Sequence, residues 1–237
     1  MTIVFLGTPP FVQSIREKLA KHFTLVDSLN EADLTVVAAY GKILTPKELE
    51  TPKYGCINIH PSLLPKYRGP SPIQKAILNG DSVSGITIIK MDKEIDHGPI
   101  IYQERIELSG NDNFDILSKK MFLRAGEVLP KIIKDFVNGK IQPVEQNHLK
   151  ASFCDRLTRE DGYFEISKPP EMLDRMIRAY YPWPGVWTLW SPTQTRSGEA
   201  KIVKFYPGKL IQMEGKKVMP LQDFLNGYPD FPLKNLS

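Results

Sequence analysis

Two polar side chains within a short apolar segment could carry acyl-transfer chemistry. Asn58 and His60 alternate with the β-branched residues Ile57 and Ile59. Successive side chains of a β-strand point to opposite faces, so the amide and the imidazole would share one face. Pro61 follows directly and ends the strand. An amide N–H and an imidazole at a strand end could stabilise the oxyanion that forms when a nucleophile attacks a carbonyl carbon.

A third candidate, Asp96, lies between two apolar runs. The runs cover residues 85–91 and 99–108 and are expected to form a pair of strands that brackets the Asp96 loop. A carboxylate near His60 would favour the charged imidazole and could relay a proton through water. Distance in sequence says nothing about distance in space, so the sequence alone leaves this arrangement open.

Taken alone, these residues also have simpler interpretations. An Asn-x-His pair is commonly a pair of hydrogen-bonded core residues, and Asp before His-Gly is ordinary turn chemistry. A metal site formed by His60, Asp96 and His97 is another alternative, but no HxxxH, HxH or CxxC spacing supports it, and we expect no metal. Arg68 could contact a phosphate or substrate tail, or could simply pair with a nearby carboxylate.

The composition limits the class of protein but does not by itself indicate a function. The chain has 237 residues, of which 41% are hydrophobic and 24% charged, and a net charge of +4 that is spread along the sequence. A nucleic-acid partner is therefore permitted but not indicated by charge. Cys56 and Cys154 are unclustered, which argues against a disulfide framework. We see neither a secretory or transit segment nor an apolar run long enough to span a bilayer, so we expect a cytoplasmic protein.

The first part of the chain is expected to be α/β. Apolar runs at 2–6 and 34–39 predict buried strands, a weaker run lies at 24–29, and 11–23 has the four-residue apolar spacing of an amphipathic helix. One long helix or two shorter ones are expected over 113–139. This order favours a Rossmann-like domain with a small parallel or mixed sheet and a ligand cleft at the strand ends. The turn after the first strand lacks GxGxxG, so a dinucleotide cofactor is not expected.

A domain boundary is expected where the apolar periodicity lapses, near residues 148–157. We predict a catalytic domain over 1–150 and a small β-rich domain over 151–237. In the second domain a helix should start near Pro170 and end before Pro182. Short β-like runs follow it at 186–190, 200–206 and 209–213.

Two stretches carry a family resemblance. The run from Asn58 to Asp81, NIHPSLLPKYRGPSPIQKAILNGD, and the run at 85–101, GITIIKMDKEIDHGPII, are similar to the catalytic core of the folate-dependent formyltransferases. That core is shared by methionyl-tRNA, sugar-nucleotide and glycinamide ribonucleotide formyltransferases. Four segments of the second half resemble the C-terminal domain of the methionyl-tRNA type: LTREDG at 157–162, IRAYYPWPGVW at 177–187, GKKVM at 215–219 and DFLNG at 223–227.

The resemblance implies an activity and site residues. By resemblance, the catalytic residues are Asn58, His60 and Asp96, and the folate contact is the loop Ser62, Leu63, Leu64 and Pro65. It implies transfer of a formyl group from 10-formyltetrahydrofolate to the α-amino group of initiator methionyl-tRNA, in translation initiation, without a metal. In such a reaction Asn58 and His60 would stabilise the oxyanion, and Asp96 would support the imidazole. A monomer is expected.

The chain also departs from the pattern of this family. Members of the methionyl-tRNA type have more chain before the NIH strand, including a basic loop that enters the tRNA acceptor end, and a longer C-terminal barrel. A shortened member with an OB-like but truncated C-terminal domain is therefore expected. A sugar-nucleotide N-formyltransferase is the main alternative, because that group does without the basic loop. A non-catalytic folate-binding or RNA-binding remnant is the alternative from another class of protein.

Overall fold

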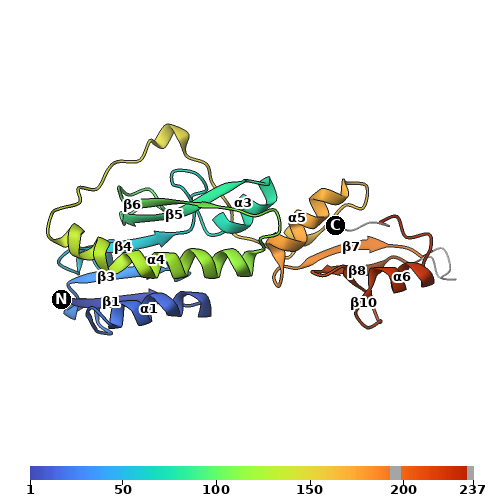
Figure 1. Cartoon of the computed structure of the whole chain (residues 1–237), viewed down its shortest axis with the longest axis horizontal. Helices are drawn as coiled ribbons and strands as arrows, with labels where there is room; N and C mark the ends of the chain where they lie inside the picture. Colours follow the sequence, from blue (N-terminus) through green and yellow to red (C-terminus); the bar gives the residue numbers. More distant parts are fainter. Residues whose placement is uncertain (193–198, 234–237) are drawn as a thin grey trace. The chain divides into compact units, whose positions relative to one another are not determined.

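The computed structural model describes residues 1–192 and 199–233 (Figure 1). The chain divides into two compact units, and the expected boundary at residue 150 stays a prediction. Unit 1 consists of Met1–Lys75, Asp81–Gly110 and Asp115–Arg156, and unit 2 of Ala76–Gly80, Asn111–Phe114 and Leu157–Ser237.

A mixed six-stranded sheet forms the centre of unit 1, in the order β2-β1-β3-β4-β5-β6. The first four of these strands are parallel, whereas β5 runs antiparallel to both β4 and β6. The expected Rossmann-like fold with a small mixed sheet is therefore confirmed. The strands are β1 (Thr2–Gly7), β2 (Thr24–Leu25), β3 (Leu34–Ala38), β4 (Cys56–His60), β5 (Val83–Lys90) and β6 (Ile100–Glu107).

Two helices of unit 1 pack against each other, α1 (Gln13–Ala20) and the long α4 (Phe114–Val137). The rings of Phe11 and Phe122 stack with their centroids 5.2 Å apart. At Gly126 an added Cβ would lie 3.4 Å from Cα of Ile15, so α4 and α1 are in close contact at this position. The shorter helices are α2 (Pro46–Glu50), which begins with a capping box, and α3 (Pro72–Asn79).

Two expected elements of unit 1 are shorter than the apolar pattern indicated. The helix expected over 11–23 is split into a 3-10 turn, Pro10–Val12, and α1, which ends at Ala20. The strand expected over 24–29 pairs with β1 only at Thr24–Leu25. Strand length depends on a hydrogen-bonded neighbour, and β2 lies at the edge of the sheet where it has one neighbour only.

Unit 2 is built on an antiparallel sheet of four strands in the order β10-β9-β8-β7, which confirms the expected β-rich module. Trp190 packs edge-on against Phe224, Tyr228 and Phe231, with the Phe231 centroid 5.0 Å away. Large aromatic side chains thus supply the core of this small unit. Its elements are α5 (Pro170–Tyr180), β7 (Val186–Trp190), β8 (Lys201–Tyr206), β9 (Leu210–Met213), β10 (Met219–Pro220) and α6 (Leu221–Gly227).

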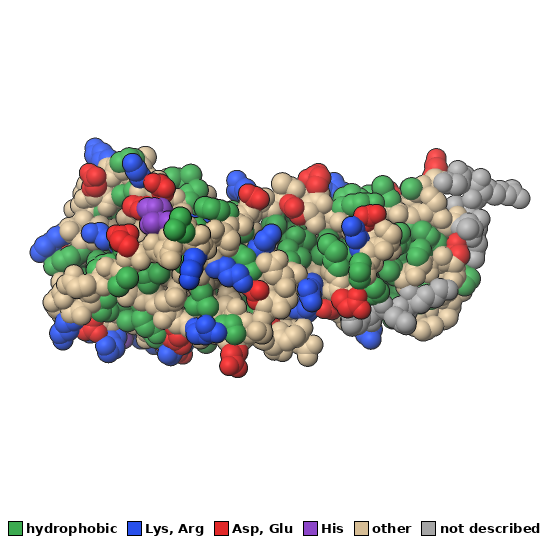
Figure 2. Space-filling model, turned by 90° about the horizontal axis from the view of Figure 1, so that it is seen from above, with side chains coloured by type: hydrophobic (Ala, Val, Ile, Leu, Met, Phe, Trp, Pro, Cys, Tyr) green, Lys and Arg blue, Asp and Glu red, His purple; other side chains and the backbone are tan. Residues whose placement is uncertain are grey.

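Figure 2 shows basic and acidic side chains mixed on the face it draws, without a large patch of one sign on that face. Among the helices of residues 1–192 and 199–233, none is long and apolar enough to cross a membrane.

Candidate active site

The NIH segment forms β4, which lies between the parallel strand β3 and the antiparallel strand β5. Asn58 is paired with Val37 on one side and Ile89 on the other, and His60 is paired with Thr87. Ile57 and Ile59 are each 1% exposed. The strand therefore has the predicted form: the two isoleucines lie on one face, in the core, and the amide and the imidazole lie on the other face near the end of the strand.

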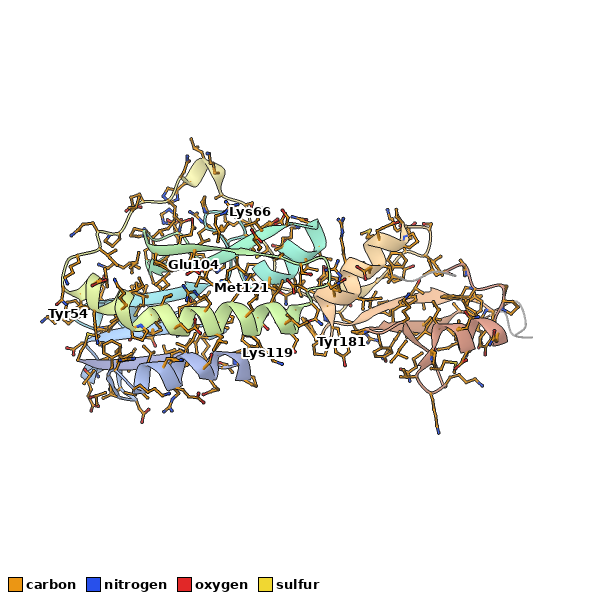
Figure 3. All side chains as sticks on the ribbon, in the orientation of Figure 1. Tyr54, Lys66, Glu104, Lys119, Met121 and Tyr181 are labelled. Carbon is orange, nitrogen blue, oxygen red and sulfur yellow. The ribbon has the colours of Figure 1, made fainter. Side chains whose placement is uncertain are left out.

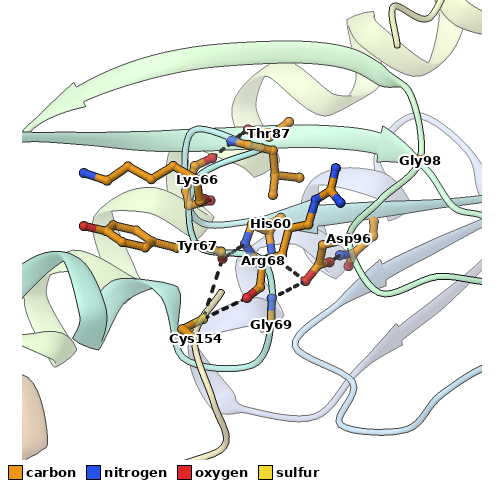
Figure 4. Close-up of polar contacts among 12 residues, drawn as sticks. His60, Lys66, Tyr67, Arg68, Gly69, Thr87, Asp96, Gly98 and Cys154 are labelled. Carbon is orange, nitrogen blue, oxygen red and sulfur yellow. Dashed lines mark hydrogen bonds and ion pairs between the residues drawn. The ribbon is translucent and has the colours of Figure 1, made fainter. Parts of the chain in front are cut away.

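Asp96 lies in the connection between β5 and β6 and meets both polar residues of β4 (Figure 4). Nδ2 of Asn58 donates to Oδ1 of Asp96 at 3.1 Å, and Nδ1 of His60 lies 3.4 Å from Oδ2. The backbone N–H of Gly69 donates to the same Oδ2 at 2.8 Å. A carboxylate only accepts hydrogen bonds, so its contact with Asn58 fixes which end of the amide faces Asp96.

Backbone strain accompanies this placement. Asp96 has a φ of 50° and Tyr67 a φ of 63°, both in the left-handed region. Aspartate tolerates this region, but for a bulky residue such as tyrosine it is unusual and is held by the surrounding structure. The carbonyl oxygen of Tyr67 lies 2.8 Å from Nε2 of His60. A carbonyl cannot donate, so Nε2 carries the proton and Nδ1 is the nitrogen that faces the carboxylate.

The segment expected to contact folate forms a tight loop, and side chains of β5 and β6 form hydrogen bonds with its backbone. Thr87 donates to the carbonyl of Ser62 at 2.6 Å and accepts from the N–H of Leu64 at 3.2 Å. Gln103 donates to the carbonyl of Leu64 at 2.9 Å. The Ser62 hydroxyl is turned into its own loop, where it donates to the carbonyl of Lys66 at 2.6 Å. The contact of this loop with folate stays a prediction.

Two residues that follow the loop, the exposed Lys66 and the buried Tyr67, both contact Asp81. Lys66, labelled in Figure 3, places its Nζ 2.8 Å from Oδ2 of Asp81, and the Tyr67 hydroxyl donates to the same oxygen at 2.8 Å. The ammonium group also lies 4.5 Å from the centroid of the Tyr67 ring. These contacts anchor the loop to Asp81.

Arg68 binds an amide and an imidazole instead of the carboxylate that was one of its two expected partners, and its contact with a phosphate or substrate tail stays a prediction. Its side chain is 5% exposed, and its Nε and Nη2 donate to Oε1 of Gln146 at 3.2 and 2.7 Å. Nη2 also lies 2.8 Å from Nδ1 of His148. Among the residues that the structure describes, Arg68 forms no ion pair with a carboxylate.

Sequence reasoning did not identify several residues that hold this site together, namely Thr87, Gln103, Gln146 and Cys154. Burial raises the pKa of the Cys154 thiol, which lies 3.3 Å from the carbonyl oxygen of Arg68. All four act on backbone groups of the loops, and no local sequence pattern reports such a contact.

Within the described residues, no group of three His, Cys, Asp or Glu side chains is arranged to hold a metal ion.

The sequence matches two family descriptions. Residues 3–133 match "Formyl transferase", and residues 156–210 match "Formyl transferase, C-terminal domain". A methionyl-tRNA formyltransferase of Roseiflexus sp. (strain RS-1) is 42% identical over 171 residues, which are 72% of this chain and 53% of the relative. The chain spans about half the length of the first curated relatives it matches.

One relative is matched over nearly its whole length. A methionyl-tRNA formyltransferase of Caldicellulosiruptor saccharolyticus is 31% identical over 304 aligned positions, which cover 96% of this chain and 97% of the relative. Because 304 positions exceed the 237 residues of this chain, the relative has internal segments that this chain lacks. The chain is therefore a shortened relative, as expected from the sequence.

Two solved structures share the fold. The methionyl-tRNA formyltransferase from Clostridium thermocellum superposes with a TM-score of 0.64 at 19% identity, over 92% of this chain and 96% of that chain. A sugar N-formyltransferase from Shewanella sp. FDAARGOS_354 superposes with a TM-score of 0.67 at 17% identity, over 84% and 95%. At these identities the two structures bear on the fold alone.

Proposed function

Because the chain belongs to the formyl transferase family, we propose that it transfers a formyl group from 10-formyltetrahydrofolate to the α-amino group of initiator methionyl-tRNA. The observation that carries the proposal is the contact of Asp96 with both Asn58 and His60 at the end of β4. An amide, an imidazole and a carboxylate are the groups that acyl transfer to an amine needs, and here the amide and the imidazole both lie close to the carboxylate.

Asn58 and His60 would act on the oxygen of the formyl group, which requires Nε2 of His60 to exchange the carbonyl of Tyr67 for that oxygen. When the amine attacks the formyl carbon, that oxygen becomes negatively charged, and N–H donors aimed at it lower the barrier. Asn58 has two N–H groups and uses one of them on Asp96, which orients the other. A buried site strengthens such contacts, and His60 is 4% exposed. One oriented donor of this kind contributes about 10²- to 10³-fold to kcat.

Asp96 would serve the proton balance of the reaction. The attacking amine must lose a proton, and N10 of the folate must gain one as it leaves. The carboxylate can accept a proton through water and hand it on, and it lies 3.4 Å from Nδ1 of His60. No covalent intermediate on the protein is needed. The donor set also fits a metal-free reaction, because the carboxylate is engaged by three N–H donors or ring nitrogens.

The acceptor is assigned from the second half of the chain. Residues 156–210 match the C-terminal domain of the family, and relatives at 42% and 31% identity carry the name methionyl-tRNA formyltransferase. A sugar-nucleotide acceptor remains the second candidate, because sugar N-formyltransferases share the fold and this chain lacks segments that its tRNA-named relatives have. We further propose a cytoplasmic, monomeric enzyme of translation initiation.

A transfer assay tests the proposal. The protein is incubated with 10-formyltetrahydrofolate and either charged initiator methionyl-tRNA or dTDP-linked amino sugars, and formylated product is measured. We expect the tRNA to be formylated. Formylation of the sugars alone would overturn the assigned acceptor, and no transfer to any amine would favour the non-catalytic remnant.

A substitution at the site links any activity to this chain. His60→Ala removes the imidazole, and we expect kcat to fall about 10²- to 10³-fold while the protein stays folded. A contaminating enzyme would leave the rate unchanged by this substitution. Circular dichroism of the variant verifies that its fold is retained.

A further inference from the structure

Gln146 occupies a central place in the loops around Asp96. Gln146 is 5% exposed. Two positions before it, Val144 forms a pair of backbone hydrogen bonds with Ile100: the N–H of Ile100 donates to the carbonyl of Val144 at 2.8 Å, and the N–H of Val144 donates to the carbonyl of Ile100 at 2.9 Å. This pair of hydrogen bonds places the segment after α4 beside the start of β6, next to the turn that carries Asp96. Nothing in the sequence around Gln146 marks it as part of a site.

The side chain of Gln146 uses its full hydrogen-bonding capacity on the site. Nε2 donates to the carbonyl oxygen of Asp96 and to that of Gly98, both at 2.8 Å. Oε1 accepts from Nε and Nη2 of Arg68. An amide has two N–H donors and an oxygen with two lone pairs, so all four positions are occupied. Such a saturated, buried group allows one orientation of the amide only.

These contacts determine where the carboxylate of Asp96 lies. The residue is in the left-handed region, with a φ of 50°, so its side chain leaves the backbone in a direction that an ordinary turn would not give. The two carbonyls that Gln146 binds lie on either side of His97 and define this turn. At Gly98 an added Cβ would lie 1.9 Å from the carbonyl oxygen of Lys90, so the far end of the turn is fixed by close backbone packing.

Arg68 extends the same network to the other side of the site. The residues on either side of it supply the carbonyl of Tyr67, which binds His60, and the N–H of Gly69, which binds Asp96. The pair of Arg68 and Gln146 thus ties this loop to the Asp96 turn. Hydrogen bonds from a charged group are stronger than neutral ones, and this one is buried.

We propose that Gln146 is a positioning residue, which holds the carboxylate of Asp96 against Asn58 and His60 through its bonds to the Asp96 turn and to Arg68. The effect on the reaction rests on the proposed function, whereas the placement of the carboxylate does not. Two substitutions separate the contacts. Gln146→Glu keeps an acceptor for Arg68 but has no N–H for the carbonyls of Asp96 and Gly98. Gln146→Met keeps the volume and loses every bond.

The kinetic test compares these variants with Gln142→Glu, an exposed residue of the same segment. A displacement of a reacting group by about 1 Å costs on the order of 10²-fold in rate. We expect Gln146→Glu and Gln146→Met to lower kcat by about that factor while the KM for 10-formyltetrahydrofolate changes less than threefold, and Gln142→Glu to match the wild type. A purely structural role would instead lower the folded fraction and leave the kcat of the folded enzyme unchanged. A wild-type kcat in folded Gln146→Met would overturn the proposal.

A second readout does not depend on activity. The amide proton of Gly69 donates to the Asp96 carboxylate, so its NMR chemical shift and its rate of hydrogen exchange report on where that carboxylate lies. We expect Gln146→Met to move the Gly69 amide signal upfield and to speed its exchange, as Asp96→Ala does, and Gln142→Met to leave both unchanged. An unchanged Gly69 signal in Gln146→Met would refute the positioning role even if the wild type transferred no formyl group. Absence of transfer by the wild type would count against the proposed function alone.

Discussion

Asn58 and Asp96 are 38 residues apart in the sequence, yet Nδ2 of Asn58 donates to Oδ1 of Asp96 at 3.1 Å. The contact exists because β5 returns antiparallel beside β4, and the connection from β5 to β6 then brings Asp96 back to the end of β4. His60 meets the other oxygen of the same carboxylate at 3.4 Å. Asp96 therefore links the two polar groups of β4 into one site.

Asp96→Asn should nearly abolish transfer. The new NH₂ group would face an N–H donor, either that of Asn58 or that of Gly69, and the negative charge beside His60 would be lost. We expect kcat to fall by about 10²- to 10⁴-fold, which is the usual contribution of a general acid or base. Steady-state formyl transfer measures the effect, with Glu94→Gln, an exposed carboxylate in the same loop, as the matched control. Equal rates for the two variants would contradict the role of Asp96.

Thr87→Val should loosen the loop at residues 62–65. Valine has nearly the same shape but no hydroxyl, so the carbonyl of Ser62 and the N–H of Leu64 lose their partner in a fully buried place. We expect a loss of about 1–3 kcal/mol in the free energy of unfolding and a higher KM for 10-formyltetrahydrofolate. Urea denaturation and steady-state kinetics measure these quantities.

A matched control for this substitution is Thr188→Val. The Thr188 hydroxyl is buried and has no hydrogen-bond partner within the described ranges, so its removal should cost little or stabilise the protein. If Thr87→Val were as harmless as Thr188→Val, the hydrogen bonds of Thr87 would not be what holds the loop.

Gly69→Ala should both destabilise the protein and disturb the site. Gly69 has a φ of 115°, and an added Cβ would lie 2.1 Å from the carbonyl oxygen of Cys154. The backbone must therefore shift, and with it the N–H that binds Asp96. We expect a loss of about 1–3 kcal/mol in stability and a fall in kcat. Gly110→Ala is the control, because an added Cβ there meets nothing within 4 Å. A thermal unfolding midpoint of Gly69→Ala equal to that of Gly110→Ala would show that the loop accommodates the side chain.

The buried thiol of Cys56 should make the free energy of unfolding fall as the pH rises above 9. Burial raises the pKa of its thiol from 9.0 to about 11. As the pH rises above 9, the thiol of the unfolded chain ionises while that of the folded chain does not, so the free energy of unfolding falls until the pH passes about 11. Urea denaturation between pH 8 and 11 should show a smaller fall for Cys56→Ala than for the wild type. Parallel curves for the two proteins would mean that this thiol ionises equally easily in the folded and the unfolded chain.

The local parts of the site followed from the sequence. Alternation of Asn58 and His60 with two isoleucines predicted a strand with both polar groups on one face, and β4 has this form. Apolar runs also located β5, β6 and α4, because the periods of strands and helices depend on neighbouring residues. The length of the edge strand β2 was overestimated, because the number of strands that lie beside a strand is not a local property of its sequence.

By itself, the sequence indicated which residues could do the chemistry and, through its resemblance to a family, which reaction to expect of them. Only the tertiary structure decided that Asp96 meets Asn58 and His60, that Arg68 binds an amide and an imidazole rather than a carboxylate, and that Gln146 occupies the centre of the loops. These contacts join residues that are between 36 positions (His60 and Asp96) and 80 positions (Arg68 and His148) apart in the sequence. A local pattern records the face on which a side chain lies, whereas the partner across a loop is set by how the strands pair and where the chain returns.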